Sequence, residues 1–232
     1  MPSLAEKLQS LSRARVFFAH QSVGQNVLDG VSVLALQTGI RLRIEEGRGA
    51  APVATPGIVH ALAGKDGAPL TKLEAFAALL EEGAGAAQLA LLELSYADVN
   101  ANTDVDALFA AFKKVHDALH GKFPATRFLA VTVGLSTVGR GLQGMLKNKM
   151  ASGAFGELQN VKRHQFNALL RKQYGPAVFD LAAVQAGPCS FEREGHSWPC
   201  LREELTDDGH HLNALGRKEA GRAFVEAVAS AL

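Results

Sequence analysis

Short apolar segments alternate along this chain with longer stretches of helical periodicity, and this alternation constrains the fold more than any other feature. The apolar segments have the length and the β-branched or aromatic residues typical of buried parallel strands. Parallel strands need right-handed crossovers, and helices must cover both faces of their sheet. We therefore predict an α/β fold, a three-layer α/β/α sandwich with a five-stranded parallel sheet. The strands are expected at 15–19, 41–45, 89–94, 127–133 and 177–181.

Between these segments, apolar residues recur at helical spacing in five stretches. The stretches begin near Val23, Leu73, Leu108, Phe166 and Leu215. Three longer segments, 46–71, 134–153 and 185–209, fit neither pattern and each follows an expected strand closely. In open α/β sheets the loops after the carboxyl ends of the strands build the binding crevice, so we expect the functional site there.

Composition narrows the class of partner. The chain has 232 residues, of which 47% are hydrophobic, enough for one core and a single domain over 1–232. The 24 Lys and Arg residues nearly balance the 23 Asp and Glu residues, so no overall charge favours nucleic acid or an anionic membrane. No apolar run reaches the roughly 18 residues that a membrane span needs. A small neutral or polar molecule, such as an ester, suits this balance.

Ser22 lies where the first expected strand meets the first helix. Such a serine is held on a tight turn, and the first backbone N–H groups of the helix point toward whatever its oxygen attacks. A serine at this position is also a common helix N-cap, whose hydroxyl accepts a hydrogen bond from a backbone N–H. The local sequence alone therefore leaves a nucleophile and a cap as alternatives.

A histidine near the other end of the chain favours the nucleophile. Asp208 precedes His211 by three residues, just ahead of the last helix, so its carboxylate can orient the imidazole. Ser22 follows the first strand and this pair follows the last one, so all three should meet at one edge of the sheet. We predict a catalytic triad of Ser22, His211 and Asp208.

A metal cluster is the alternative use of the same region. It would comprise Asp207, Asp208, His210 and His211, with His20 as an optional further ligand. Adjacent histidines rarely bind one ion together with both neighbouring carboxylates, so we expect neither a metal nor a cofactor.

A serine near the amino terminus and Asp-x-x-His near the carboxyl terminus resemble the SGNH (GDSL-like) hydrolases, and the resemblance covers nearly the whole chain. It implies a flavodoxin-like sandwich and esterase chemistry without a metal. Ser22 and Gly24 match the first block of the family, and the last block is matched by Asp208, Gly209, His211, Asn213 and Gly216.

Two blocks depart from the usual pattern. His20 and Gln21 stand where the family has Gly-Asp, which is typical of a divergent bacterial branch similar to carbohydrate esterases, with the motif His-Gln-Ser-Val-Gly. In the third block, Ala97 replaces the asparagine that normally donates to the oxyanion. The resemblance then implies the backbone N–H groups of Ser22 and of Gly57 or Gly64 as donors, with Asn100 or Asn102 as possible substitutes for the missing side chain.

Three other polar residues accompany these blocks. His20 either lines the pocket or forms a hydrogen bond across the turn, and Asp98 either caps the next turn or faces the crevice. Glu93 interrupts an apolar strand, and a buried carboxylate needs a partner. We expect Glu93 to form a structural ion pair.

The sequence thus predicts a serine esterase acting on small acyl esters, with O-acetyl groups on a carbohydrate implied by the resemblance. A lipase, thioesterase or acyltransferase could use the same triad, and a non-catalytic carbohydrate-binding module is the alternative from another class. The oligomeric state is left open.

The state of the two cysteines indicates the cellular compartment in which the protein works. Cys189 and Cys200 either form a disulfide or remain thiols. The protein is expected to be periplasmic or secreted if they are bridged and a signal peptide has been removed, because residues 1–7 lack its features. Otherwise it is expected to be cytoplasmic.

Overall fold

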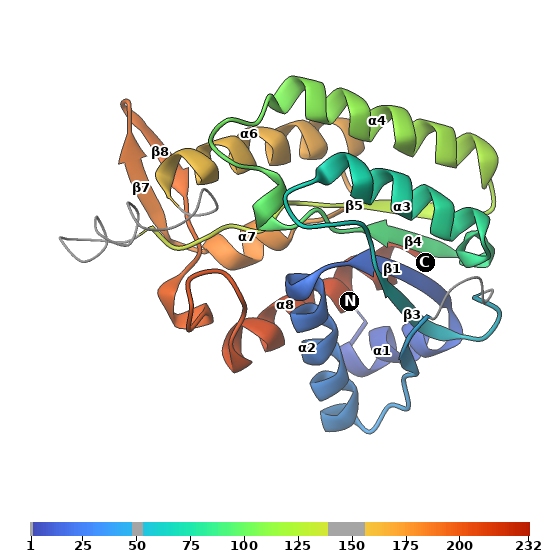
Figure 1. The fold of residues 1–232 in the computed structure, drawn as a ribbon. Helices are drawn as coiled ribbons and strands as arrows, with labels where there is room; N and C mark the ends of the chain where they lie inside the picture. Colours follow the sequence, from blue (N-terminus) through green and yellow to red (C-terminus); the bar gives the residue numbers. More distant parts are fainter. Residues whose placement is uncertain (1, 48–52, 139–155) are drawn as a thin grey trace.

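The structure is a computed structural model that describes residues 2–47, 53–138 and 156–232 (Figure 1). Its centre is a parallel sheet with strand order β2-β3-β1-β4-β5-β6. The strands are β1 (Arg15–His20), β2 (Ile44–Glu46), β3 (Gly57–Leu62), β4 (Leu89–Leu92), β5 (Arg127–Val131) and β6 (Val178–Phe179). The described sheet therefore has six strands, and the prediction of five is wrong.

The additional strand is β3, which lies in the segment 46–71 that the sequence indicated as a loop. β3 pairs with β1 on one side and with β2 on the other. One partner, β1, comes from a distant part of the chain, so the segment becomes a strand through pairing that local periodicity does not report.

Helices cover both faces of the sheet, which confirms the three-layer α/β/α arrangement (Figure 1). One face carries α1 (Leu4–Arg13), α2 (Ser22–Thr38), α7 (Leu181–Ala186) and α8 (Ala214–Ala231). The other face carries α3 (Pro69–Glu81), α4 (Val105–Lys122) and α6 (Glu157–Tyr174). Helices α1 and α7 are additions to the five helices expected from periodicity.

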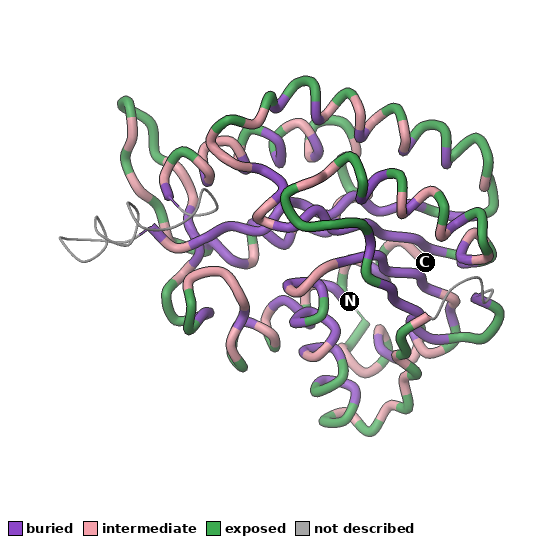
Figure 2. The backbone as a smooth tube through the Cα atoms, viewed as in Figure 1, coloured by how far each residue is buried: buried purple, intermediate pink, exposed green. Residues whose placement is uncertain are grey.

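Strand β1 contributes side chains to two hydrophobic cores, one on each face of the sheet. Val16 and Phe18 pack into the core under α2 and α8, whereas Phe17 and Ala19 pack into the core under α3 and α4. Successive side chains of a strand point to opposite faces, so an uninterrupted apolar run fits a strand buried on both sides. Figure 2 colours most of β1 as buried.

Two glycines let α2 and α8 approach backbone to backbone. A Cβ atom on Gly30 would lie 1.8 Å from the carbonyl oxygen of Arg217, and one on Gly221 would lie 2.6 Å from the carbonyl carbon of Gly30. Because α2 begins at Ser22 and α8 follows the His211 segment, this close crossing helps to bring the two ends of the candidate site together.

The cysteines are bridged. Cys189 and Cys200 form a disulfide with their Cα atoms 5.2 Å apart, which confirms the first of the two alternatives. The bridge closes the base of an antiparallel hairpin formed by β7 (Ser190–Arg193) and β8 (His196–Pro199). This hairpin lies in the segment 185–209 that the sequence indicated as a loop. Of the segment 134–153, residues 139–153 lie outside the described residues.

Three short 3-10 turns complete the described elements: η1 (Ala84–Ala86), η2 (Tyr96–Asp98) and η3 (Glu203–Leu205). Among the helices of the described ranges, none is both long and apolar enough to cross a membrane.

Candidate active site

Ser22 is the first residue of α2 and directly follows the carboxyl end of β1. The N-cap of α2 is Gln21, and the Ser22 hydroxyl lies 2.9 Å from Nε2 of His211. Ser22 is therefore not the N-cap residue of this helix, and its oxygen faces a histidine.

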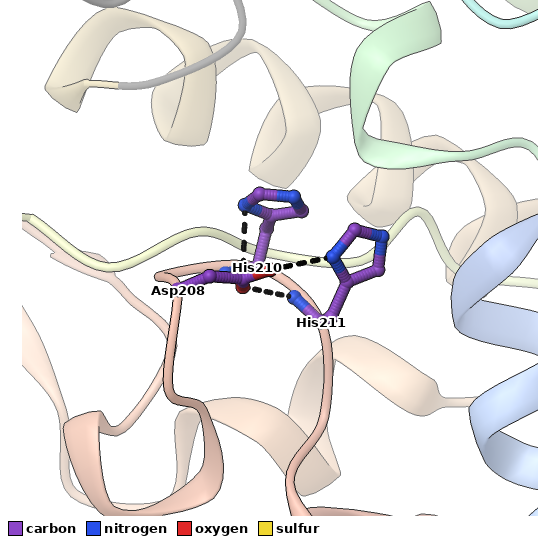
Figure 3. A group of neighbouring side chains, drawn as sticks. All are labelled: Asp208, His210 and His211. Atoms are coloured by element: carbon purple, nitrogen blue, oxygen red, sulfur yellow. Dashed lines mark hydrogen bonds and ion pairs between the residues drawn. The ribbon is translucent and has the colours of Figure 1, made fainter.

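The histidine is held by a carboxylate. His211 Nδ1 lies 2.6 Å from Asp208 Oδ2, and Asp208 Oδ1 accepts the backbone N–H groups of His210 at 3.0 Å and His211 at 2.9 Å (Figure 3). Partial burial raises the pKa of Asp208, but the His211 side chain and the two backbone N–H groups outweigh it and hold that pKa well below its usual range. A charged Asp208 favours His211 with a proton on Nδ1, which leaves Nε2 to accept the hydroxyl proton of Ser22.

Asn26 joins the two ends of this site, and sequence reasoning missed it. Its Oδ1 accepts the backbone N–H of Leu212 at 2.9 Å in a buried position. Asn26 lies one helical turn after Ser22, and Leu212 follows His211. The available signal was a polar amide on the otherwise apolar face of the helix that became α2.

Two backbone N–H groups near Ser22 are available to a ligand. Within the described residues, neither the Ser22 N–H nor the Gly64 N–H has a hydrogen-bond acceptor. Gln21 Nε2 donates to the carbonyl oxygens of Ala63 at 2.7 Å and Gly64 at 3.3 Å, which ties the loop after β3 to the Ser22 turn. Gly64 has φ +59°, and a Cβ there would lie 2.7 Å from the backbone nitrogen of Lys72.

Gly57, the other glycine considered as a donor, is at the wrong edge of the sheet. It begins β3 beside Arg15, the first residue of β1, whereas Ser22 follows the last residue of that strand. Its N–H donates to the carbonyl oxygen of Ala14 at 2.7 Å. Strand polarity therefore excludes Gly57 as an oxyanion donor, because the amino end of a parallel strand faces away from the crevice.

His20 does not line the crevice. The ring is fully buried, with Nδ1 2.7 Å from the carbonyl oxygen of Gln21 and Nε2 2.9 Å from Nδ1 of His60. Burial lowers the pKa of His20 to about 4. This neutral pair of histidines supports the turn from within the core, which corrects the assignment of His20 to substrate binding.

Asp98 also lies beneath the crevice. Its Oδ2 accepts the Ser95 N–H at 2.7 Å and forms an ion pair with the buried Lys72 at 2.7 Å, while Oδ1 accepts the Gly67 N–H at 2.9 Å. Lys72 is shared with Asp66, also at 2.7 Å. Asp98 thus joins the loop after β3 to the loop after β4, and its assignment to substrate binding is wrong.

The two asparagines form their own turn. Asn100 Oδ1 accepts the Asn102 N–H at 2.9 Å, and the Asn100 N–H donates to Oγ1 of Thr103 at 2.9 Å. Among the hydrogen bonds of the described residues, none joins either asparagine to Ser22 or His211.

Glu93 was expected to form an ion pair, but its partners are backbone N–H groups. Within the described ranges it forms no ion pair. Its Oε2 accepts the backbone N–H groups of Gln21 and Gly24, each at 3.0 Å. Backbone donors at the start of a helix carry partial positive charge and can replace a cationic side chain.

Part of the alternative metal cluster does come together. Potential ligand atoms of Asp208, His210 and His211 lie within 4.8 Å of one another (Figure 3). His20 is not in this group because it pairs with His60. Asp208 Oδ2 and His211 Nδ1 already bond to each other, so an ion bound through these atoms would compete with the contact that orients His211.

Comparisons with known proteins concern the fold. No protein-family model matches the sequence, and no curated protein matches it. A lipase/acylhydrolase from Enterococcus faecalis is similar in structure, with TM-score 0.55, 12% identity, and 93% of this chain and 96% of that chain covered.

Two esterases are similar as well. The family 3 carbohydrate esterase of Clostridium thermocellum has TM-score 0.53 and 12% identity, covering 94% of this chain and 99% of its own. A catalytic mutant of an acetylxylan esterase from Geobacillus stearothermophilus has TM-score 0.51 and 12% identity, with 94% of both chains covered. This chain therefore has the fold of the SGNH (GDSL-like) hydrolases.

Proposed function

We propose that this protein is a serine esterase in which Ser22 is the nucleophile, His211 the general base and Asp208 the residue that orients the histidine. The observation that carries the proposal is one chain of contacts. Ser22 Oγ lies 2.9 Å from His211 Nε2, and His211 Nδ1 lies 2.6 Å from Asp208 Oδ2. Both distances fit hydrogen bonds, and this order of groups is what nucleophilic acyl transfer requires.

In the proposed reaction the Ser22 oxygen attacks the acyl carbonyl while its proton passes to His211 Nε2. The resulting imidazolium is stabilised by Asp208 and then gives the proton to the leaving alcohol. The acyl group remains on Ser22. A water molecule, deprotonated by the same histidine, attacks the acyl-enzyme, releases the carboxylic acid and restores the serine hydroxyl.

The oxyanion is proposed to bind to the backbone N–H groups of Ser22 and Gly64. The support is that neither donor has an acceptor in the described part of the chain, and that Gln21 ties the two loops together. Preorganised donors of this kind stabilise the negative charge that develops on the carbonyl oxygen.

For the substrate we propose a small acyl ester, with acetyl on a carbohydrate as the first choice. Two of the proteins with the same fold are described as a carbohydrate esterase and an acetylxylan esterase. A lipase, thioesterase or acyltransferase remains the alternative, because a lipase/acylhydrolase shares the fold too. We propose that residues 1–232 form one domain and, given the Cys189–Cys200 bridge, that it works in the periplasm or outside the cell.

A non-catalytic carbohydrate-binding module is the second candidate. Ala97 favours it, because this position lacks the side-chain amide that the resemblance calls for. Removal of one oxyanion donor typically costs about a hundred- to a thousandfold in turnover. The two candidates differ in whether Ser22 is activated.

Labelling with a fluorophosphonate probe, followed by peptide mapping, tests the proposal without knowledge of the substrate. We expect the label on Ser22 and its loss in Ser22→Ala. Ser32→Ala is the matched control, because Ser32 lies on the same helix with its hydroxyl bonded to the Leu28 carbonyl oxygen at 2.9 Å. An unlabelled wild-type protein would favour the binding module. A panel of p-nitrophenyl esters then separates acetyl from longer acyl groups.

A further inference from the structure

Glu93 is a buried carboxylate beside the site that the triad does not use. It follows the carboxyl end of β4, between Leu92 and Leu94, and only 1% of its surface is exposed. A buried carboxylate is costly unless its oxygens accept hydrogen bonds, and among the described residues Oε2 has donors whereas Oε1 has none. The identity of its donors therefore shows what the residue does.

Both donors are backbone groups that flank Ser22. Glu93 Oε2 accepts the N–H of Gln21 and the N–H of Gly24, each at 3.0 Å. One belongs to the residue before Ser22 and the other to the second residue after it. A single carboxylate oxygen from the neighbouring strand thus holds the backbone on both sides of the serine.

The start of α2 lacks a cap of its own. Gln21 occupies the N-cap position without a side-chain cap hydrogen bond, and its amide is turned to the Ala63 carbonyl oxygen at 2.7 Å. The first N–H groups of a helix need acceptors and attract negative charge. Glu93 Oε2, just after a neighbouring strand, supplies the acceptor for two of them.

Gly24 permits this contact because it has no side chain. A Cβ atom there would lie 2.7 Å from Glu93 Oε2 and 2.3 Å from Cβ of His20. Any larger residue would push the carboxylate away from the turn. The close approach of both His20 and Glu93 therefore explains the glycine two positions after Ser22.

We propose that Glu93 is the positioning residue of the nucleophile: by holding the Gln21 and Gly24 amides, it sets Ser22 Oγ within reach of His211 Nε2. Its catalytic consequence rests on the proposed esterase function. A displacement of about 1 Å in a reacting group can cost about a hundredfold in rate. Loss of this contact therefore lowers the rate of acyl transfer without changing the substrate pocket.

The test compares Glu93→Met, Glu93→Asp and Glu93→Gln. Methionine keeps the length but not the acceptor, aspartate shortens the carboxylate by one methylene, and glutamine keeps one acceptor oxygen. The measurements are the rate of Ser22 labelling by the fluorophosphonate, kcat and KM on p-nitrophenyl acetate, and the NMR shifts of the Gln21 and Gly24 amides.

For Glu93→Met we expect labelling and kcat to fall by about a hundredfold, KM to stay within about threefold, and both amide signals to move. Glu93→Gln should restore activity to within about tenfold of wild type, and Glu93→Asp should fall between the two. The control is Thr126→Val. Thr126 is buried before β5 at the opposite edge of the sheet, with its hydroxyl bonded to the carbonyl oxygens of Gly85 and Ala87 at 3.0 and 2.9 Å.

Thr126→Val should lose stability and keep the labelling rate. Wild-type labelling in folded Glu93→Met, or a rise in KM with kcat unchanged, would overturn the proposal. Should Glu93→Met fail to fold, labelling of Glu93→Asp as fast as wild type would overturn it instead. Failure of the wild-type protein to label would remove the proposed function, and the amide shifts would still decide whether Glu93 holds the turn.

Discussion

The side chain of Asn26 accepts a hydrogen bond from the backbone N–H of Leu212 at 2.9 Å, across 186 residues of sequence. Asn26 belongs to the helix that begins at Ser22, and Leu212 is the neighbour of His211. The bond therefore fixes the distance between the helix that carries the serine and the loop that carries the histidine. In the proposed esterase the two reacting groups come from opposite ends of the chain, and this contact helps to set the distance between them.

Replacement of Asn26 by alanine should lower activity and stability together. The buried Leu212 N–H would lose its acceptor, which costs about 1 to 3 kcal/mol of unfolding free energy. The His211 loop would gain freedom, and we expect kcat on p-nitrophenyl acetate to fall at least about tenfold. Urea unfolding and steady-state kinetics measure the two effects.

The control for this variant is Asn167→Ala. Asn167 is buried and bonds the N–H and carbonyl groups of Val133 at 2.7 and 2.9 Å, and none of its hydrogen bonds to the described residues reaches the triad. It should lose similar stability and keep kcat. Equal kcat losses in both variants would mean that Asn26 has no specific part in the site.

His211→Ala should reduce ester hydrolysis about as much as Ser22→Ala, because a nucleophile and its base act as one unit. His210→Ala should be milder. The hydrogen bond of residue 210 to Asp208 Oδ1 at 3.0 Å is made by its backbone N–H, which alanine retains, whereas alanine removes only the longer contact of ring Nδ1 with the same oxygen at 3.4 Å. Steady-state rates of the three variants provide the ranking, and a stronger effect at His210 than at His211 would contradict the assignment of the base.

Ala97→Asn should bring no gain in turnover. If the Ser22 and Gly64 N–H groups already bind the oxyanion, an added amide gives it no donor that it lacks. The kcat should then stay within about threefold of wild type or fall. Single-turnover acylation of wild type and variant is the measurement. A gain of a hundredfold would show instead that the natural site lacks a donor.

His116→Phe should stabilise the protein and flatten its response to acid. His116 is 7% exposed, neither ring nitrogen has a hydrogen-bond partner among the described residues, and burial lowers its pKa to about 4. The unfolded chain binds a proton on this residue below about pH 6.5, whereas the folded chain does so only below about pH 4. The free energy of unfolding therefore decreases as the pH is lowered through this window. At pH 5 the variant should avoid about 2 kcal/mol of this loss.

Urea unfolding at pH 7 and pH 5 measures how much stability the wild type and His116→Phe each lose in acid. His120→Phe is the control, because His120 is an exposed residue of the same helix. An unchanged difference between the two pH values in His116→Phe would contradict the assignment. His20 makes the wild type and both variants lose further stability in acid, because its pKa is lowered to about 4 as well.

The disulfide should be detectable by mass. Protein purified without reductant and treated with an alkylating agent should carry no label, and reduction should expose two thiols, Cys189 and Cys200. Closing a loop of this size stabilises a fold by roughly 2 to 3 kcal/mol, so the double serine variant should unfold at lower urea concentration. Two labelled thiols in never-reduced protein would contradict the bridge and favour a cytoplasmic location.

The sequence by itself determined the layering and the candidate triad. Apolar strands and amphipathic helices leave local periodicities, and Ser22 and the Asp208–His211 pair stand beside elements that those periodicities mark. Because parallel strands share one carboxyl edge, their order along the chain was enough to expect the three side chains near one another. The sequence also presented the cysteine pair as one of two alternatives.

Only the tertiary structure decided which partners the buried polar groups have. Gly57 and Gly64 look alike in sequence, yet they stand at opposite ends of β3, a strand that exists because it pairs with β1 and β2. Glu93 meets Gln21 across 72 residues, where an ion pair was expected. Local periodicity reports which side of an element is buried, whereas the partner of a buried polar group depends on which distant segment folds against it.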